Sequence, residues 1–150
     1  MLQPTSAIFA HLRRVLQQAY FLQLLGPKEL DQLVTSLTAT RVFKGHEIIK
    51  QGAPGDAFYL IATGKVSVWM DKGSGPQLTA ELRSDDFFGE MALISNAPRN
   101  ATVKAEGLTE LFVLQKSDFD KILMKNPGIA DKLKKAYEAR AEKNRGQDSI

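Results

Sequence analysis

A chain of 150 residues with 43% hydrophobic and 25% charged side chains has the composition of a single soluble domain that buries its own core. Its net charge of +3 is far below the basic load of nucleic-acid-binding arms and polybasic membrane patches, so we expect no direct nucleic-acid contact and no membrane insertion. The absence of cysteine excludes disulfides, thiol nucleophiles and cysteine-ligated metals, and short apolar runs without a secretory signal predict a cytoplasmic location.

Residues 1–38 are predicted to form an N-terminal helical segment. Ser6 is a candidate N-cap for a first helix, whose apolar residues recur at helical spacing: Ile8, Leu12, Val15, Leu16 and Ala19. The dipeptide Gly26-Pro27 interrupts this pattern and suits the start of a second helix, which would be lined by Leu30, Leu33, Val34 and Leu37.

Residues 39–115 alternate between apolar and polar side chains in short bursts, as expected for antiparallel strands. One burst places Val66, Val68 and Met70 on a single face, and the next does the same for Leu78, Ala80 and Leu82. Turn-forming glycines punctuate the bursts at Gly45, Gly52, Gly55 and Gly64. With the flanking helices, this pattern predicts an α+β, mainly β fold, built as a sandwich or as a roll closed upon itself.

Helical periodicity returns over residues 116–142. Ser117 and Asp120 resemble a capping box at the start of a helix, in which Phe119, Ile122 and Leu123 share a face. Asn126-Pro127 is expected to end this helix and to start another, with one stripe formed by Ile129, Leu133, Ala136, Tyr137 and Arg140. The polar residues 143–150 are predicted to form a disordered tail.

The segment 87–103 lies between two strand-like runs and is too long for a hairpin turn. Gly89 and Ala92 are small where backbone must approach a partner closely, and a helical turn starting at Glu90 would aim its free N–H groups at an anion. Arg99 follows nine residues later and offers the fork geometry that matches phosphate oxygens. The single carboxylate of Glu90 suggests that the ligand also carries a hydroxyl donor.

These residues resemble the phosphate-binding cassette of the cyclic nucleotide-binding domain family. The family pattern is F-G-E, a small residue two places after the glutamate, and P-R-x-A-[TS], and this chain matches it with Phe88-Gly89-Glu90, Ala92 and Pro98-Arg99-Asn100-Ala101-Thr102. The run from Phe43 to Val68 resembles the same family's strand framework. The likeness covers residues 8 to 140 and is strongest to the cytosolic sensors of prokaryotic cyclic nucleotide-gated potassium channels. It implies an antiparallel β-roll, a double-stranded jelly-roll-like barrel, with two C-terminal lid helices.

The resemblance also implies roles for individual residues. Glu90 would accept the ribose 2′-hydroxyl, and Arg99 would pair with the exocyclic oxygens of the cyclic phosphate. Further donors would come from the backbone amides of Gly89, Met91, Ala92 and Ala101. The sugar and the purine would be contacted by the strand residues Val66, Val68, Ala80 and Leu82, and Phe88 is a further candidate ligand-binding residue. Arg140 would lay its guanidinium across the base, although a solvated surface cation is an equally good interpretation of this residue.

Asn100 departs from the family, which usually has a small residue or a threonine that assists cGMP recognition at this position. Its amide could donate to phosphate or contact guanine, so both cAMP and cGMP remain candidate ligands. We favour cAMP, because the threonine is absent.

Nothing in the sequence predicts an enzyme, a cofactor or a metal site. Asp85 and Asp86 are interpreted as turn formers, and His11 and His46 are too distant from each other to hold a metal. The phosphate-loop, nucleophile-elbow and complete dinucleotide-binding motifs are missing.

The expected function is regulatory: a cyclic nucleotide enters the roll, and the C-terminal helices close over its base. In a parent channel, tethered to the inner face of the membrane, the partner would be the transmembrane pore. The alternatives are the ligand-binding domain of a catabolite-activator-like transcription regulator without its DNA-binding part, and a roll that has lost its ligand and serves as a scaffold.

Overall fold

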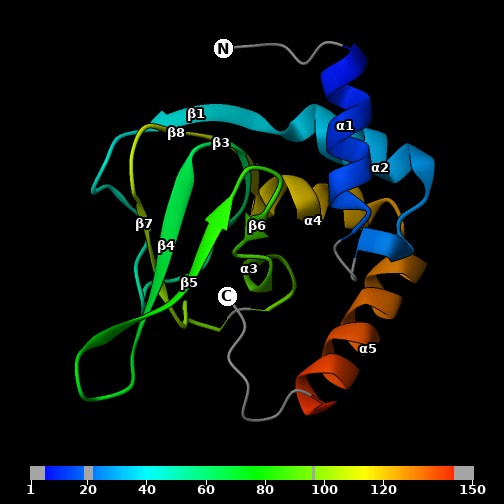
Figure 1. Ribbon diagram of the computed structural model, residues 1–150. Coiled ribbons are helices and arrows are strands. Elements are labelled where there is room, and N and C mark those ends of the chain that lie inside the picture. The colour runs from blue at the N-terminus through cyan, green and yellow to red at the C-terminus, as the bar shows by residue number, and fades with distance from the viewer. Residues whose placement is uncertain (1–5, 19–21, 96, 144–150) are drawn as a thin grey trace.

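The computed structural model describes residues 6–18, 22–95 and 97–143, and Figure 1 shows their arrangement. Helices gather at one side of a strand-rich body (Figure 1). In chain order the elements are α1 (Ser6–Leu16), the 3-10 helix η1 (Leu22–Leu24), α2 (Pro27–Ser36), β1 (Thr38–Val42), β2 (Glu47–Ile49), β3 (Ala57–Thr63), β4 (Lys65–Asp71), β5 (Pro76–Arg83), β6 (Phe87–Phe88), α3 (Met91–Ile94), β7 (Thr102–Ala105), β8 (Thr109–Gln115), α4 (Lys116–Met124) and α5 (Pro127–Lys143).

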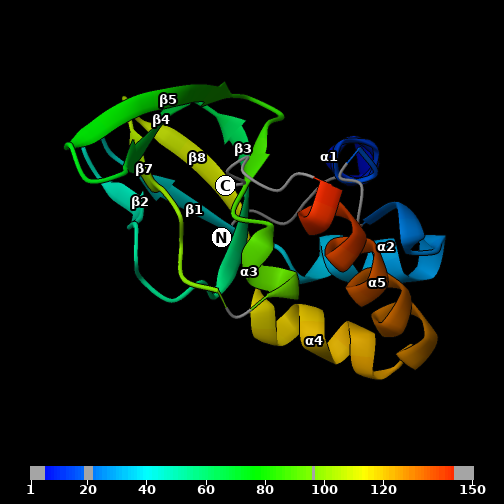
Figure 2. The same ribbon diagram turned by 90° about the horizontal axis from the view of Figure 1, so that it is seen from below.

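The strands form two sheets in which every pairing is antiparallel. The first sheet has the order β1-β8-β3-β6 and the second has the order β2-β7-β4-β5. Apart from β4 and β5, which pair within the second sheet, consecutive strands alternate between the sheets, and the two sheets face each other as a roll (Figure 2). The predicted α+β, mainly β fold with flanking helices is therefore confirmed.

The first sheet separates two hydrophobic cores. Along β3, Phe58 and Leu60 point to the helices, whereas Ala57 and Ile61 point into the roll, as the period of two in a strand requires. We call the group on the inner side the roll core; it contains Ile49, Ala57, Ile61, Val66, Val68, Met70, Phe88, Ala101, Val103, Leu111 and Val113. We call the other group the helical core; it contains Leu12, Val15, Leu16, Leu22, Leu25, Leu30, Leu33, Val34, Leu37, Phe58, Leu60, Leu93, Leu114, Phe119, Ile122 and Leu133.

A bulge in β5 makes one predicted face wrong. Val68 pairs with Ala80 but Trp69 pairs with Leu78, so Thr79 is an extra residue, and its hydroxyl donates to the carbonyl of Val68 at 3.1 Å. Such a bulge reverses the alternation of side chains beyond it. Leu78 therefore lies on the outer face opposite Trp69 and is 51% exposed, instead of sharing a buried face with Ala80.

The helix boundaries lie close to the expected ones, but one predicted capping interaction is wrong. The N-cap of α4 is Gln115 and makes no side-chain capping bond, so the capping box predicted at Ser117 and Asp120 is wrong and both residues lie inside the helix. Asn126-Pro127 ends α4 and starts α5 as predicted: the side-chain amide of Asn126 donates to the carbonyl of Ile122 at 3.0 Å, and its own carbonyl accepts from the N–H groups of Ile129 and Ala130. Gly26-Pro27 starts α2 as predicted, with Gly26 at the N-cap.

The C-terminal helix α5 packs against α4, α3 and η1 (Figure 2). Leu133 is its buried anchor in the helical core. The side chains of Ala136, Tyr137 and Arg140 lie outside the described part of the structure, as do Ala19 and residues 144–150 of the predicted tail. Within the described residues, no helix combines the length and the apolar character that a membrane span requires.

Candidate functional site

The predicted cassette forms a compact loop around a left-handed glycine. Gly89 follows β6 with φ of +82°, a conformation that L side chains rarely adopt. A Cβ at this position would lie 3.0 Å from Nη1 of Arg99 and 3.2 Å from the carbonyl oxygen of Ala57. Glycine is therefore required both by the turn and by the approach of the arginine.

Arg99 is held by two backbone carbonyls. Its Nη1 donates to the carbonyl of Gly89 at 3.1 Å and its Nη2 to the carbonyl of Ala57 at 2.6 Å. The guanidinium thus joins the cassette to the start of β3, which orients its fork before any ligand is present.

The loop between β2 and β3 hydrogen-bonds to the backbone of this arginine and packs against its side chain. Arg99 exchanges backbone bonds with the loop, because its N–H donates to Ala53 at 2.9 Å and its carbonyl accepts from Gly52 at 2.8 Å. A Cβ on Gly55 would lie 2.8 Å from that of Ala92 and 3.2 Å from Cζ of Arg99. Gly55, interpreted from the sequence as a turn former only, is therefore also a point of close packing under the cassette.

The electrostatics of the site favour an anion. Burial lowers the pKa of the Arg99 guanidinium, and nearby Tyr59, Asp56 and Glu90 oppose this effect. Burial also raises the pKa of Tyr59, which Arg99 in turn opposes. Arginine remains protonated in proteins, so a half-buried positive charge stands at the centre of the cassette.

A cavity of about 120 Å³ lies beside the arginine. It is lined by Ile49, Met91, Ala92, Ala97, Pro98, Arg99, Asn100 and Ala101. The predicted residues Met91, Ala92, Arg99, Asn100 and Ala101 are thus brought together around one hollow, with a single cationic side chain among them. The described residues contain no cluster of three or more potential metal ligands.

Glu90 stands at the N-cap of α3 and is half-buried. The turn that it opens uses two backbone bonds, from Ala92 N–H to Gly89 at 3.2 Å and from Leu93 N–H to Glu90 at 3.1 Å. The amide of Ala92, predicted to serve a phosphate, is therefore also used within the turn.

The predicted strand contacts divide into two groups. Val66, Val68 and Phe88 are completely buried in the roll core, and the ring of Phe88 stacks on Tyr59 with centroids 5.1 Å apart. Ala80 and Leu82, which pair with Val68 and Val66, are only partly buried and keep accessible surface. Ala80 and Leu82 are thus better placed to touch a ligand than the three buried residues.

Leu93 was missed as a functional candidate. This residue of α3 is 2% exposed and belongs to the helical core together with Phe119 and Leu133, and α3 packs against both α4 and α5. Its only signal in the sequence is an apolar side chain directly after Ala92. The cassette therefore contacts the C-terminal helices directly.

Comparison with known proteins identifies a matching family model and similar sequences. A family model described as "Cyclic nucleotide-binding domain" matches residues 39–126. The cyclic nucleotide-gated potassium channel mll3241 of Mesorhizobium japonicum is 40% identical over 113 residues, which are 75% of this chain and 30% of the channel. The cAMP-dependent protein kinase regulatory subunit of Yarrowia lipolytica is 37% identical over 108 residues, which are 72% of this chain and 28% of the subunit. The chain spans less than a third of either relative.

Solved structures share the same architecture. PfPKA-R with bound cAMP has a TM-score of 0.73 and 30% identity, over 81% of this chain and 43% of that chain. The N-terminal domain of a transcriptional regulator from Streptomyces coelicolor A3(2) has a TM-score of 0.72 and 26% identity, over 91% of this chain and 98% of that chain.

Proposed function

The chain belongs to the cyclic nucleotide-binding domain family, and we propose that it binds cAMP in the cassette and converts binding into movement of α4 and α5. Families of this kind regulate other proteins, and the proposal assigns no catalytic step to the chain. cAMP is favoured over cGMP because Asn100 replaces the threonine associated with cGMP and because similar proteins are named for cAMP.

The main support for this proposal is the orientation of Arg99. Two backbone carbonyls hold its guanidinium beside the 120 Å³ cavity, and burial destabilises its charge. A phosphodiester anion in the cavity would compensate this destabilisation, and the planar fork can bind two phosphate oxygens at once. Glu90, close enough to influence Arg99 electrostatically, is proposed to accept the ribose 2′-hydroxyl.

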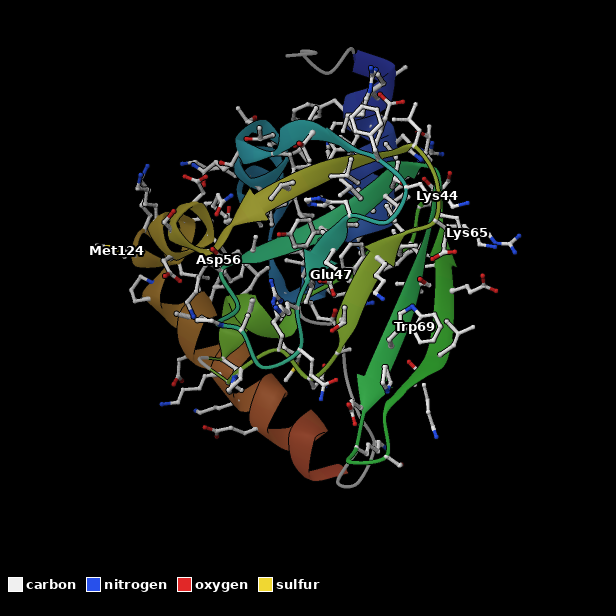
Figure 3. The ribbon with its side chains drawn as sticks, turned by 90° about the vertical axis from the view of Figure 1, so that its left-hand side faces the viewer. Lys44, Glu47, Asp56, Lys65, Trp69 and Met124 are labelled. Carbon is white, nitrogen blue, oxygen red and sulfur yellow. The ribbon has the colours of Figure 1, made fainter. Side chains whose placement is uncertain are left out.

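The start of β3 offers a path from the phosphate to the C-terminal helices. The carbonyl of Ala57 accepts from Arg99, and the carbonyl of the preceding Asp56 accepts at 2.8 Å from the N–H of Lys116, the first residue of α4. Figure 3 shows Asp56 where the roll meets the helices. A phosphate that draws Arg99 away from Ala57 would therefore act on the peptide unit next to the one that anchors α4.

Leu93 offers a second path through side-chain packing. When the cassette closes on the phosphate, α3 moves, and Leu93 must move with it or leave its place beside Phe119 and Leu133. We propose that α4 and α5 then shift so that α5 covers the base, with Arg140 as the candidate contact to the purine. The energy available for this shift is the difference in affinity between the open and closed forms.

The proposal also concerns the kind of protein that this domain regulates. The potassium-channel relative favours a sensor that gates an ion channel. A second candidate is the ligand-binding part of a transcription regulator, favoured by the match to 98% of the Streptomyces coelicolor domain. In both cases the chain would act as the regulatory part of a larger assembly.

Calorimetric titration of the purified chain with cAMP and cGMP tests the proposal. Arg99→Ala is expected to weaken cAMP binding by about 2–5 kcal/mol, the range for removing one partner of a buried charge pair. This corresponds to a loss of roughly 30-fold or more in affinity. Arg14→Ala, which removes an exposed arginine from α1, is the matched control and should leave the affinity unchanged. Unchanged cAMP affinity in Arg99→Ala would contradict the assignment of the site.

The same titration tests Glu90 with 2′-deoxy-cAMP as a second ligand. Glu90→Ala should cost about 1.5–3 kcal/mol with cAMP, the range for hydrogen bonds to charged groups, and much less with the deoxy ligand. If the variant still discriminates between the two ligands as the parent does, Glu90 does not contact the ribose 2′-hydroxyl.

A further inference from the structure

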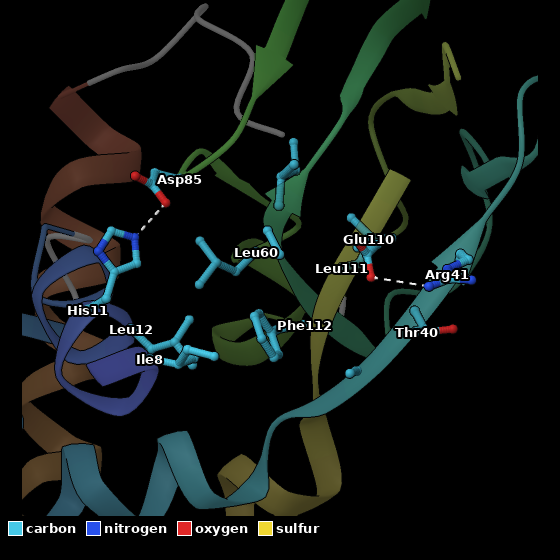
Figure 4. Close-up of a pocket in the computed structure, with 13 residues that line it drawn as sticks. Ile8, His11, Leu12, Thr40, Arg41, Leu60, Asp85, Glu110, Leu111 and Phe112 are labelled. Carbon is cyan, nitrogen blue, oxygen red and sulfur yellow. Dashed lines mark hydrogen bonds and ion pairs between the residues drawn. The ribbon is translucent and has the colours of Figure 1, made fainter. Parts of the chain in front are cut away.

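A second cavity lies on the outer face of the first sheet, between that sheet and α1 (Figure 4). Its volume of about 520 Å³ falls within the range of small-molecule pockets in proteins. Three parts of the chain enclose it: helix α1, strands β1, β8 and β3, and the turn at Asp85 between β5 and β6.

The cavity exists because α1 covers only part of the sheet. Leu12 from α1 and Leu60 from β3 are almost fully buried and form the apolar wall, together with Phe112 from β8. Ala39 and Ala62 lie farther along the same sheet face, where their small side chains leave the space open. Figure 4 shows Ile8 and Leu12 of α1 on one side of the cavity and Leu60 and Phe112 of the sheet on the other.

A pair of polar side chains lies at each end of the cavity. Nε2 of His11 lies 2.8 Å from Oδ1 of Asp85 and ties α1 to the turn. At the other end, Nη2 of Arg41 lies 3.6 Å from Oε2 of Glu110, across the pairing of β1 with β8. The two pairs engage all four ionisable side chains that line the cavity, and an uncharged ligand leaves both pairs in place.

We propose that this cavity is a second binding site, for an uncharged, mainly apolar molecule. The proposed nucleotide site uses the cassette, and the first sheet stands between the cavity and the roll core, where Leu111 and Val113 point inward. The two sites are therefore separate, and both contact β3: the nucleotide site through Ala57, the cavity through Leu60 and Ala62.

The test uses the uncharged fluorescent probe N-phenyl-1-naphthylamine with the full chain. We expect its fluorescence to rise and saturate at one probe per chain, without displacement by saturating cAMP. Ala39→Phe, on the edge strand β1, fills the cavity and should weaken probe binding at least tenfold while leaving cAMP affinity within about twofold of the parent. Ala10→Phe, at an exposed position of α1, is the matched control and should retain full probe binding.

Thermal melting followed by circular dichroism checks that each variant is folded, and Ala62→Phe replaces Ala39→Phe if the latter does not fold. Absence of saturable probe binding would overturn the proposal, as would displacement by cAMP or unchanged probe affinity in the folded filled variant. Because the probe titration needs no nucleotide, failure of cAMP to bind would contradict the proposed function and leave this test intact.

Discussion

The roll core and the helical core differ in which parts of the sequence supply their residues. The residues of the roll core all lie between Ile49 and Val113, mainly on strands, whereas the helical core collects residues from Leu12 to Leu133. The roll core can therefore form from one stretch of sequence, but the helical core depends on how distant helices are placed. A signal that reaches the helical core reaches every helix that contributes to it.

The cassette contributes residues to both cores, as strands β3 and β8 also do. Phe88 and Ala101 are buried in the roll core, and Leu93, between them in sequence, is buried in the helical core. Ligand binding would therefore act on a segment whose ends are buried in the roll core and whose middle contacts the helices that we propose to move. This difference predicts distinct effects for substitutions at Phe88, Leu93 and Gly89.

Phe88→Ala should have the largest effect. Removing a completely buried ring from the roll core is expected to reduce the free energy of unfolding by about 3–5 kcal/mol, because the sheets on both sides cannot close the space. Urea denaturation measures the loss, with Phe43→Ala, whose side chain is 67% exposed, as the control. Equal losses in the two variants would contradict a stabilising role for Phe88 in the roll core.

Leu93→Ala should have a smaller effect on stability and a larger one on signalling. We expect a loss of about 2–3 kcal/mol in the free energy of unfolding, the lower end for leucine, because α3 is short and its neighbours can move inward. In NMR spectra, the cAMP-induced changes in residues 127–143 should shrink by more than half, while those of Gly89 and Ala101 persist.

Leu108→Ala, at a 55% exposed position, is the control for Leu93 and should leave the response of α5 unchanged. A full response of α5 in Leu93→Ala would show that the signal passes through the carbonyls of Asp56 and Ala57 instead.

Gly89→Ala and Gly45→Ala should have the smallest effects on stability and should differ in cAMP affinity. Both glycines have positive φ, +82° and +89°, so either substitution should cost about 1–2 kcal/mol of stability. A Cβ at Gly45 meets nothing within 4 Å, whereas one at Gly89 crowds Arg99. Only Gly89→Ala should therefore weaken cAMP binding in calorimetry, and equal affinities in the two variants would remove Gly89 from the site.

Much of this arrangement could be predicted from the sequence, because its signals are local. Alternation, turn glycines and the Gly26-Pro27 boundary depend on near neighbours, and the motif around Gly89 and Arg99 identified the cassette. The helices were placed to within a few residues; α4 begins at Lys116, only one residue before the expected Ser117.

What could not be predicted depends on contacts between distant segments. The bulge at Thr79 is stabilised by a bond to Val68 on the neighbouring strand, and no local pattern signals it. The burial of Leu93 follows from the position of α5, and the role of Gly55 follows from the approach of Arg99, which is 44 positions away in the sequence. The cavity beside α1 depends on how far that helix extends over the sheet, which periodicity does not encode.

The alternation of side chains along β3 has a thermodynamic consequence. Because neighbouring residues of one strand supply opposite layers, neither layer can melt while the other stays packed, and the domain should unfold in a single cooperative transition. A nucleotide bound at the cassette would then raise the thermal stability of α1 and α2 as well, although it contacts neither of them.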